Sequence, residues 1–204
     1  MMTYTGIFLA VVAYLVGSVS FAIIVSRLLK LEDPRSYGSG NPGATNVLRS
    51  GSKKAAALTL LGDALKGLVP IALFSLFAVD LGLTNWDLAL CSVTVLLGHM
   101  WPIFFRFKGG KGVATAVGVL LALHWPLALC CFAIWLVMAF GFKISSLAAL
   151  IAALASPVLA FCFGLAVPLQ CAIVVIAVLV LYRHIPNIKK LLAGQEGKIG
   201  NRAK

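Results

Sequence analysis

Three polar segments of the sequence carry residue types that bind phosphate, and the first covers residues 38–49, which read GSGNPGATNVLR. Glycines let a backbone turn tightly and present its N–H groups to an anion. Ser39, Thr45 and Asn46 add neutral donors, and Arg49 offers a planar guanidinium that can hold phosphate through two hydrogen bonds. We interpret this segment as an anion-binding loop; the alternative is a polar turn that only connects two membrane spans.

The same loop formally contains GxGxxG, at Gly38, Gly40 and Gly43. The dinucleotide fingerprint needs a preceding strand inside a βαβ unit. Here long apolar runs lie on both sides of the loop. The motif therefore predicts exposed backbone N–H groups and no dinucleotide cofactor.

The second polar segment reads GHMWP at residues 98–102 and RFKGGKG at residues 106–112. It lacks the spacing of a P-loop, but Lys111 is surrounded by Gly109, Gly110 and Gly112. A cation among exposed amides, where a helix is expected to begin, favours phosphate binding. We expect His99 to position this loop. The alternative is a cluster of basic residues whose glycines serve a tight turn.

The third polar segment, residues 184–194, reads HIPNIKKLLAG and follows the last apolar run. His184 and Asn187 lie three apart, which places them on one side of a helical turn, and we expect them to point toward the other two loops. Pro186 and Gly194 are typical of the start and end of a short helix. The two lysines of this helix, at 189 and 190, can equally well face anionic lipid headgroups.

Ionisable and metal-binding residues elsewhere give weaker signals. Asp63 and Lys66 fall inside a predicted span, where ionisable groups are functional by default. Their spacing lets them pair, so both a structural ion pair and a pair that supports the site remain open. The five cysteines show neither a CxxC pair nor a spacing with histidine that binds metal, and we predict no metal and no cofactor.

The composition requires a membrane to position these loops. Of 204 residues, 61% are hydrophobic and 11% charged, and the mean hydropathy is +1.03, whereas about a quarter of the residues in soluble domains are charged. Long stretches free of charge end at residues 26, 79, 105, 142 and 182. The last two stretches are long enough to turn, near His124 and between Gly164 and Pro168. We predict an all-α integral membrane protein with seven transmembrane helices in a single domain, residues 1–204.

The charge of +11 is first a signal of topology, so we expect no nucleic acid partner. With seven spans, 16 of the 17 basic residues fall on one side, and the other side carries only Asp80 and Asp87. Lys and Arg near span ends stay in the cytoplasm. The predicted topology is N-terminus out and C-terminus cytoplasmic, with the active site in the loops at the cytoplasmic face.

Residues 38–49, 98–115 and 184–200 together resemble the three cytoplasmic motifs of the bacterial membrane acyl-phosphate:glycerol-3-phosphate acyltransferase family. The resemblance covers essentially the whole chain. It implies transfer of a fatty acyl group from acyl phosphate to the sn-1 hydroxyl of glycerol 3-phosphate, which gives lysophosphatidic acid and phosphate. It also implies a bacterial inner-membrane location and a soluble upstream enzyme that makes acyl phosphate.

The matching catalytic positions are Ser39, Arg49, Lys111, His184 and Asn187. We expect substrate binding at Gly38, Gly40, Asn41, Gly43, Thr45, Asn46, His99, Gly109, Gly110 and Gly112. The sequence has no His-x4-Asp dyad and no evident Ser-His-Asp set. Acyl phosphate has a good leaving group, so positioning and charge neutralisation suffice. We predict that a phosphate oxygen of the donor accepts the hydroxyl proton.

A transporter and a lipid-binding scaffold are the alternatives to acyl transfer. A transporter for an anionic phosphate compound would use the Asp63–Lys66 pair, but transporter sites usually lie near the midplane between repeats. The motifs here lie at one membrane face, and the sequence shows no repeat. A noncatalytic lipid-binding scaffold would not need three such loops.

Overall fold

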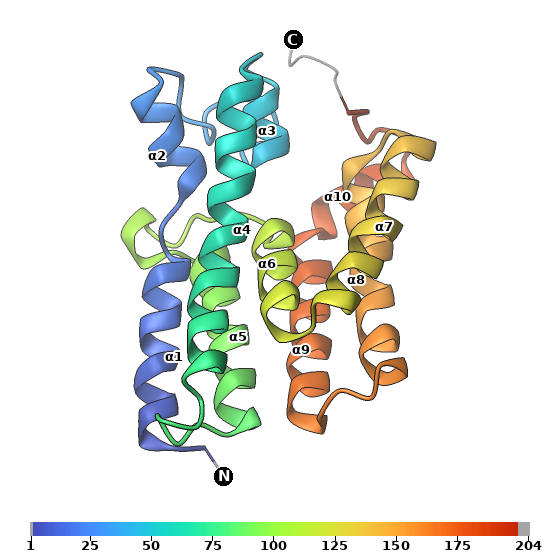
Figure 1. Cartoon of the computed structure of the whole chain (residues 1–204). Helices are drawn as coiled ribbons and strands as arrows, with labels where there is room; N and C mark the ends of the chain where they lie inside the picture. The colour runs from blue at the N-terminus through green and yellow to red at the C-terminus, as the bar shows by residue number, and fades with distance from the viewer. Residues whose placement is uncertain (1, 200–204) are drawn as a thin grey trace.

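The computed structural model describes residues 2–199, and within that range the chain forms ten α-helices and one 3₁₀ helix (Figure 1). The all-α prediction is confirmed. Three residues assigned from the sequence to the cytoplasmic tail, Gly200, Arg202 and Lys204, lie outside the described residues. The elements are α1 (Tyr4–Gly17), α2 (Phe21–Leu28), α3 (Ala44–Leu48), α4 (Lys53–Leu76), α5 (Asn85–Met100), η1 (Ile103–Phe105), α6 (Val113–Leu123), α7 (Trp125–Phe142), α8 (Ser145–Cys162), α9 (Val167–Arg183) and α10 (Ile185–Leu192).

The helices give a multi-pass membrane protein. Among the described residues, five segments are long and apolar enough to cross a bilayer: Tyr4–Leu28, Lys53–Leu76, Asn85–Phe105, Trp125–Phe142 and Ser145–Cys162. The pair α9 and α10, bent by 57°, brings the number to six if it is counted as one span. The 11 residues of α6 reach only about half of a hydrocarbon core of roughly 30 Å. From α4 to α9, successive helices run in alternating directions (Figure 1).

Both predicted breaks in the long apolar runs are present. His124 separates α6 from α7, and its Nδ1 accepts a hydrogen bond from the Leu127 N–H at 3.3 Å, as an N-cap does. The second break lies between the end of α8 at Cys162 and the start of α9 at Val167. Gly164, with φ +66°, makes that turn, because glycine adopts positive φ without steric cost.

A third break, inside the first apolar run, was not predicted. The backbone leaves the helix between Gly17 and Phe21, and this separates α1 from α2. A carbonyl freed inside a span needs a donor. The ammonium of Lys66, on α4, supplies one to the Val19 carbonyl at 2.7 Å. A buried lysine, which hydropathy counts as unfavourable, thus stabilises the break.

Two helix pairs pack with their backbones in contact, and one of them positions the site. Between α4 and α6, a Cβ at Gly67 would overlap the Thr115 carbonyl and a Cβ at Gly118 would overlap that of Ala64. Glycines similarly bring α1 against α5. The contact of α4 with α6 fixes the start of α6 beside the middle of α4, at the level of Asp63. There the Asp63 carbonyl accepts a hydrogen bond from the Thr115 hydroxyl at 3.0 Å.

Candidate active site

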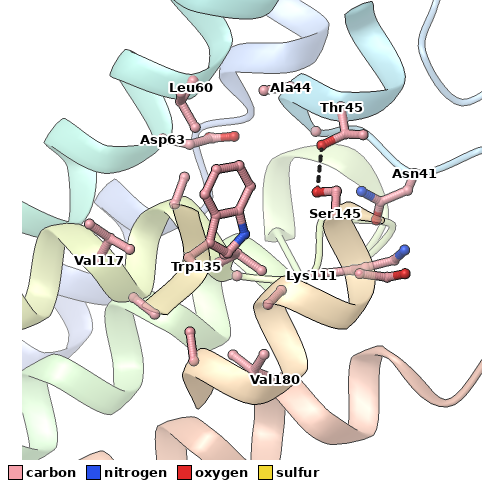
Figure 2. Close-up of a pocket in the computed structure, with 18 of the residues that line it drawn as sticks. Asn41, Ala44, Thr45, Leu60, Asp63, Lys111, Val117, Trp135, Ser145 and Val180 are labelled. Atoms are coloured by element: carbon pink, nitrogen blue, oxygen red, sulfur yellow. Dashed lines mark hydrogen bonds between the residues drawn. The ribbon is translucent and has the colours of Figure 1, made fainter. Parts of the chain in front are cut away.

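A cavity of about 720 Å³ opens between α3 and α4 on one side and α6 to α9 on the other. Figure 2 shows polar side chains, among them Thr45, Ser145 and Lys111, on one side of Trp135, and Val117 on the other. The apolar walls come mainly from leucine, alanine, valine and isoleucine side chains of α4, α6, α8 and α9. The cavity therefore combines a polar region with an apolar region in one continuous space.

The three polar segments meet at this cavity. All five predicted catalytic residues line it: Ser39, Arg49, Lys111, His184 and Asn187. Six of the ten predicted binding residues do as well: Asn41, Gly43, Thr45, Asn46, His99 and Gly112. The other four, Gly38, Gly40, Gly109 and Gly110, are not among the residues that line it. They belong to the loops that carry Ser39 and Lys111, and their part in substrate binding stays a prediction.

Asn46 holds the first loop in shape. Its Oδ1 accepts from the Ser39 N–H at 3.0 Å, and its Nδ2 donates to the carbonyls of Pro34 at 2.6 Å and Tyr37 at 3.2 Å. The side chain is 2% exposed. Through these contacts Asn46 organises the loop; its contact with substrate stays a prediction. Gly38, at φ +60° and against Asn46 Oδ1, leaves no room for a Cβ.

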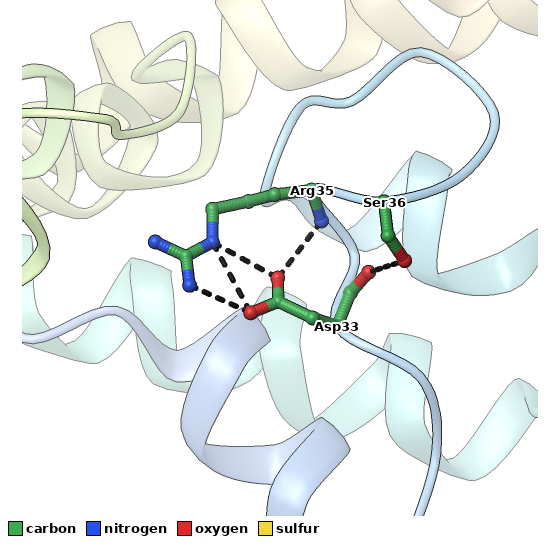
Figure 3. A network of polar contacts seen from close by, with 3 residues as sticks. All are labelled: Asp33, Arg35 and Ser36. Carbon is green, nitrogen blue, oxygen red and sulfur yellow. Dashed lines mark hydrogen bonds and ion pairs between the residues drawn. The ribbon is translucent and has the colours of Figure 1, made fainter.

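A charged turn precedes this loop (Figure 3). The Asp33 carboxylate accepts from Arg35 Nη2 at 2.6 Å and from the Arg35 N–H at 2.9 Å, and the Ser36 hydroxyl donates to the Asp33 carbonyl at 2.8 Å. The hydrogen bond from Arg35 holds the pKa of Asp33 below its ordinary value, against the opposing effect of partial burial. Arg35 is thus engaged by Asp33. The Arg49 guanidinium, by contrast, has no hydrogen bond or ion pair with another residue of the range 2–199.

Lys111 begins a chain of polar contacts across the cavity. Its Nζ donates to Asn187 Oδ1 at 2.6 Å, and Asn187 Nδ2 donates to Glu196 Oε1 at 2.6 Å. The same carboxylate oxygen accepts from the Ser146 hydroxyl at 2.6 Å. Burial lowers the pKa of Lys111 to about 8; the Glu196 carboxylate opposes this effect, and the positive charge of Arg49 adds to it.

Hydrogen bonds with two different helices fix the backbone before Lys111. The Gly110 N–H donates to the His99 carbonyl at 3.1 Å, so this amide is not available to an anion. The Arg183 side chain donates to the carbonyls of Gly109 at 2.8 Å and Gly110 at 3.0 Å. Gly112, at φ +88°, then starts α6 without a side-chain cap. The first N–H groups of a helix lack partners within the helix, and here they begin at the cavity wall.

His184 and His99 are both buried, in different surroundings. His184 is 2% exposed, and its Nδ1 lies 2.8 Å from the Val180 carbonyl. A carbonyl only accepts, so Nδ1 carries the proton and Nε2 is the nitrogen left to accept. His99 Nδ1 lies 3.6 Å from Asp63 Oδ1, which Lys66 approaches at 2.8 Å. Lys66 therefore has a structural role at the helix break, while Asp63 and His99 reach the cavity wall.

Sequence reasoning missed four cavity or loop residues. The residue types and spacing predict no part in the site for Glu196, Arg183, Ser145 or Ser146. A signal existed for Arg183, since it directly precedes His184. No signal existed for the serines, because the contacts of Ser146 with Glu196 and of Ser145 with Thr45 depend on tertiary packing. Among residues 2–199, no three His, Cys, Asp or Glu side chains gather as metal ligands do.

The family model described as glycerol-3-phosphate acyltransferase matches residues 7–194. The chain belongs to the glycerol-3-phosphate acyltransferase family. A family member from Neisseria meningitidis serogroup B (strain MC58) is 63% identical over 93% of this chain and 94% of its own length. One from Chromobacterium violaceum is 55% identical over 98% of both chains. Both carry the name glycerol-3-phosphate acyltransferase.

Two solved structures of this family share the fold. They are crystal structures of PlsY (YgiH), an integral membrane glycerol 3-phosphate acyltransferase, in a glycerol 3-phosphate form and a lysophosphatidic acid form. The TM-scores are 0.89 and 0.87 at 40% and 39% identity, and each match covers 96% of this chain. The chain is therefore an acyltransferase of the membrane type, as its motifs predicted.

Proposed function

We propose that this acyltransferase moves a fatty acyl group from acyl phosphate to the sn-1 hydroxyl of glycerol 3-phosphate. The observation that carries the proposal is the cavity, in which a region with Arg49, Lys111 and His184 continues into an apolar region. An acyl phosphate has this combination of an anionic head and a long apolar chain. The glycerol 3-phosphate and lysophosphatidic acid forms of the similar structures support the acceptor and the product.

The five predicted catalytic residues divide between two phosphate groups in this proposal. Ser39 and Lys111, with the first N–H groups of α6, hold the donor phosphate, since helix N-termini bind anions. Arg49, His184 and Asn187 hold glycerol 3-phosphate. The 2.6 Å hydrogen bond from Lys111 to Asn187 brings the two sets into contact, as a reaction between their substrates requires.

The transfer needs no enzyme-bound intermediate. The sn-1 hydroxyl oxygen attacks the acyl carbon, a C–O bond forms, and the bond from the acyl carbon to the phosphate oxygen breaks. A phosphate oxygen of the donor takes the hydroxyl proton, so the leaving group departs as inorganic phosphate. Lys111 and the helix terminus neutralise the charge that develops on this group.

A transporter is less well supported by the contacts. The Asp63–Lys66 pair, which motivated that alternative, is engaged at the helix break through the Val19 carbonyl. An ion pathway would need a pair whose partners change, and the contacts of Lys66 hold it in place. In a noncatalytic scaffold, the contact between the two sets of residues that hold phosphate would have no function.

The topology in this proposal has seven passes, with α6 as a short pass, the N-terminus outside and the C-terminus in the cytoplasm of a bacterial inner membrane. The predicted helix breaks and the distribution of basic residues support it. The polar region of the cavity then faces the cytoplasm, where glycerol 3-phosphate is available. A soluble enzyme that produces acyl phosphate is the expected partner.

The test uses purified protein in detergent with palmitoyl phosphate and labelled glycerol 3-phosphate. We expect lysophosphatidic acid and an equal amount of inorganic phosphate. Product formed only with acyl-CoA would overturn the donor assignment, and no product with either donor would overturn the function. The Ser39→Ala variant tests the site: turnover near that of the wild type at saturating substrates would show that Ser39 does not hold the donor.

A further inference from the structure

Arg183 is a cationic residue at the end of α9 whose hydrogen bonds go to backbone carbonyls. It is half-buried, and among the described residues it takes part in no salt bridge. Its donors instead reach two backbone carbonyls, those of Gly109 at 2.8 Å and Gly110 at 3.0 Å. Its guanidinium carbon lies 5.4 Å from the centre of the Trp101 ring. Burial of an unpaired charge costs free energy. A basic residue that served only membrane topology would not need to be buried, so topology does not explain this arrangement.

The two carbonyls belong to the turn that delivers Lys111. The Gly110 N–H is held by the His99 carbonyl, so the turn is fixed by α5 on one side and by α9 on the other. A Cβ at Gly110 would overlap the His99 ring, and one at Gly109 would overlap the His99 carbonyl. The turn therefore has little freedom as long as Arg183 keeps its place.

The segment that carries Arg183 also contacts the Lys111 side chain. Arg183 and Asn187 are four residues apart, and Asn187 accepts from Lys111 at 2.6 Å. One short stretch of chain thus holds both the backbone before Lys111 and its ammonium group. We propose that Arg183 is a positioning residue that fixes Lys111 and the start of α6 in the geometry needed for acyl transfer. This inference rests on the proposed function.

The planar guanidinium of Arg183 donates to both carbonyls, and a lysine side chain cannot replace it. An ammonium group retains the charge but has no planar pair of donors. We therefore expect Arg183→Lys to lower kcat/KM by roughly 10- to 100-fold, because misplacement by about 1 Å can cost that much. The matched control is Arg106→Lys, on the exposed part of the same connection, which should stay within about twofold of the wild type.

A double-mutant cycle separates positioning from a loss of structure. If Arg183 acts through Lys111, Arg183→Lys adds little to the loss caused by Lys111→Met, since the two effects are coupled. Hydrogen exchange gives a readout that does not depend on activity. Amides in a peptide covering residues 106–113 should exchange faster in Arg183→Lys, while those in α5 keep the wild-type rate.

Three results would overturn the inference. These are activity of Arg183→Lys equal to that of Arg106→Lys, additive losses in the double mutant, or unchanged exchange at residues 106–113. If Arg183→Lys does not fold, Trp101→Leu removes the ring that covers the guanidinium and should produce a smaller loss with the same coupling to Lys111. Failure of the proposed function is distinguishable, because the wild-type protein would then give no product.

Discussion

The two glycine-rich loops at the cavity have similar compositions, but they differ in whether their own residues or those of other segments fix their shape. The first, residues 38–49, exposes Gly38, Ser39 and Gly40, and its own Asn46 fixes its shape from within. The second, residues 109–112, buries its glycines and is fixed from outside by His99 and Arg183. An internally braced, exposed loop suits a substrate that enters from water. A buried loop held by other helices suits a cation whose position must not change.

This difference predicts which residues are sensitive. In the first loop the donors that face the cavity, Ser39 and Arg49, are separate from the residue that braces the loop. In the second loop the functional cation follows directly after the braced turn. Changes near Lys111 should therefore affect both the charge and the geometry of the site, whereas changes in the first loop should affect one of the two.

The largest effect is expected from Lys111→Met, which removes the cation and keeps the length of the side chain. The loss of a charged donor to the leaving phosphate should lower kcat/KM by about 10²–10³-fold. Lysophosphatidic acid formation in detergent measures it. Lys108→Met, an exposed lysine three residues earlier, is the control and should have nearly wild-type activity. If Lys111→Met kept more than a tenth of the activity, the second loop would not hold the donor.

Asn46→Ala should break the first loop. It removes the donor to the Pro34 and Tyr37 carbonyls and the acceptor of the Ser39 N–H, and a buried polar group left without its partner costs about 1–3 kcal/mol. We expect kcat/KM to fall by roughly 10- to 100-fold together with a lower melting temperature. Ser36→Ala, which removes a single exposed hydrogen bond, is the control. Unchanged melting and activity in Asn46→Ala would mean that the loop is not braced from within.

Paired glycine substitutions sharpen the comparison. At Gly110 a Cβ would overlap the His99 ring, and overpacking of this kind costs about 1–3 kcal/mol and displaces Lys111. At Gly40 the Cβ has room, and the cost is the positive φ of +66°, about 1–2 kcal/mol. We expect roughly tenfold lower activity in Gly110→Ala and a smaller loss in Gly40→Ala.

Gly141→Ala is the control for both glycine variants, because a Cβ there has no atom within 4 Å. Melting curves and initial rates of the three variants give the order. Equal losses of activity at Gly40 and Gly110 would show that burial of the second loop does not matter.

Much of the fold and site follows from local sequence signals. Breaks at His124 and at Gly164 come from polar, proline and glycine residues within apolar runs, so they were predictable. The motif residues Ser39, Arg49 and Lys111 carry chemistry at a spacing that is readable without a structure. The break between α1 and α2 was not readable, because its stabilising donor is Lys66 of a distant helix.

The division of roles within the motifs also needed the structure. Asn46 and Gly110 are residue types that often bind substrate, but their N–H groups donate to carbonyls of the protein. Glu196 and Arg183 have the residue types of surface charges. The position of each depends on how the end of α9 and the segment after it pack against the rest of the chain. A sequence lists donors and acceptors, but tertiary contacts decide which of them remain available to a substrate.

The pH dependence of activity distinguishes the two loops without any substitution. Burial lowers the pKa of Lys111 to about 8, so its charge is complete at pH 6.5 and is lost as the pH rises through 8. Arg49, a guanidinium, keeps its charge over this range. The substrate phosphates, with a second pKa near 6, do not titrate there. We expect kcat/KM at pH 9 to be about tenfold below its value at pH 7, one pKa unit past the midpoint.

Lys111→Arg is the matched variant, because it keeps a cation that does not titrate below pH 10. Whatever its absolute rate, its profile should be flat between pH 7 and pH 9.5 once spontaneous hydrolysis of palmitoyl phosphate is subtracted. A wild-type profile that is also flat would place the Lys111 pKa well above 8 and would mean that the second loop is more open to water than its contacts with His99 and Arg183 imply. A decline shared by both proteins would assign the titration to another group.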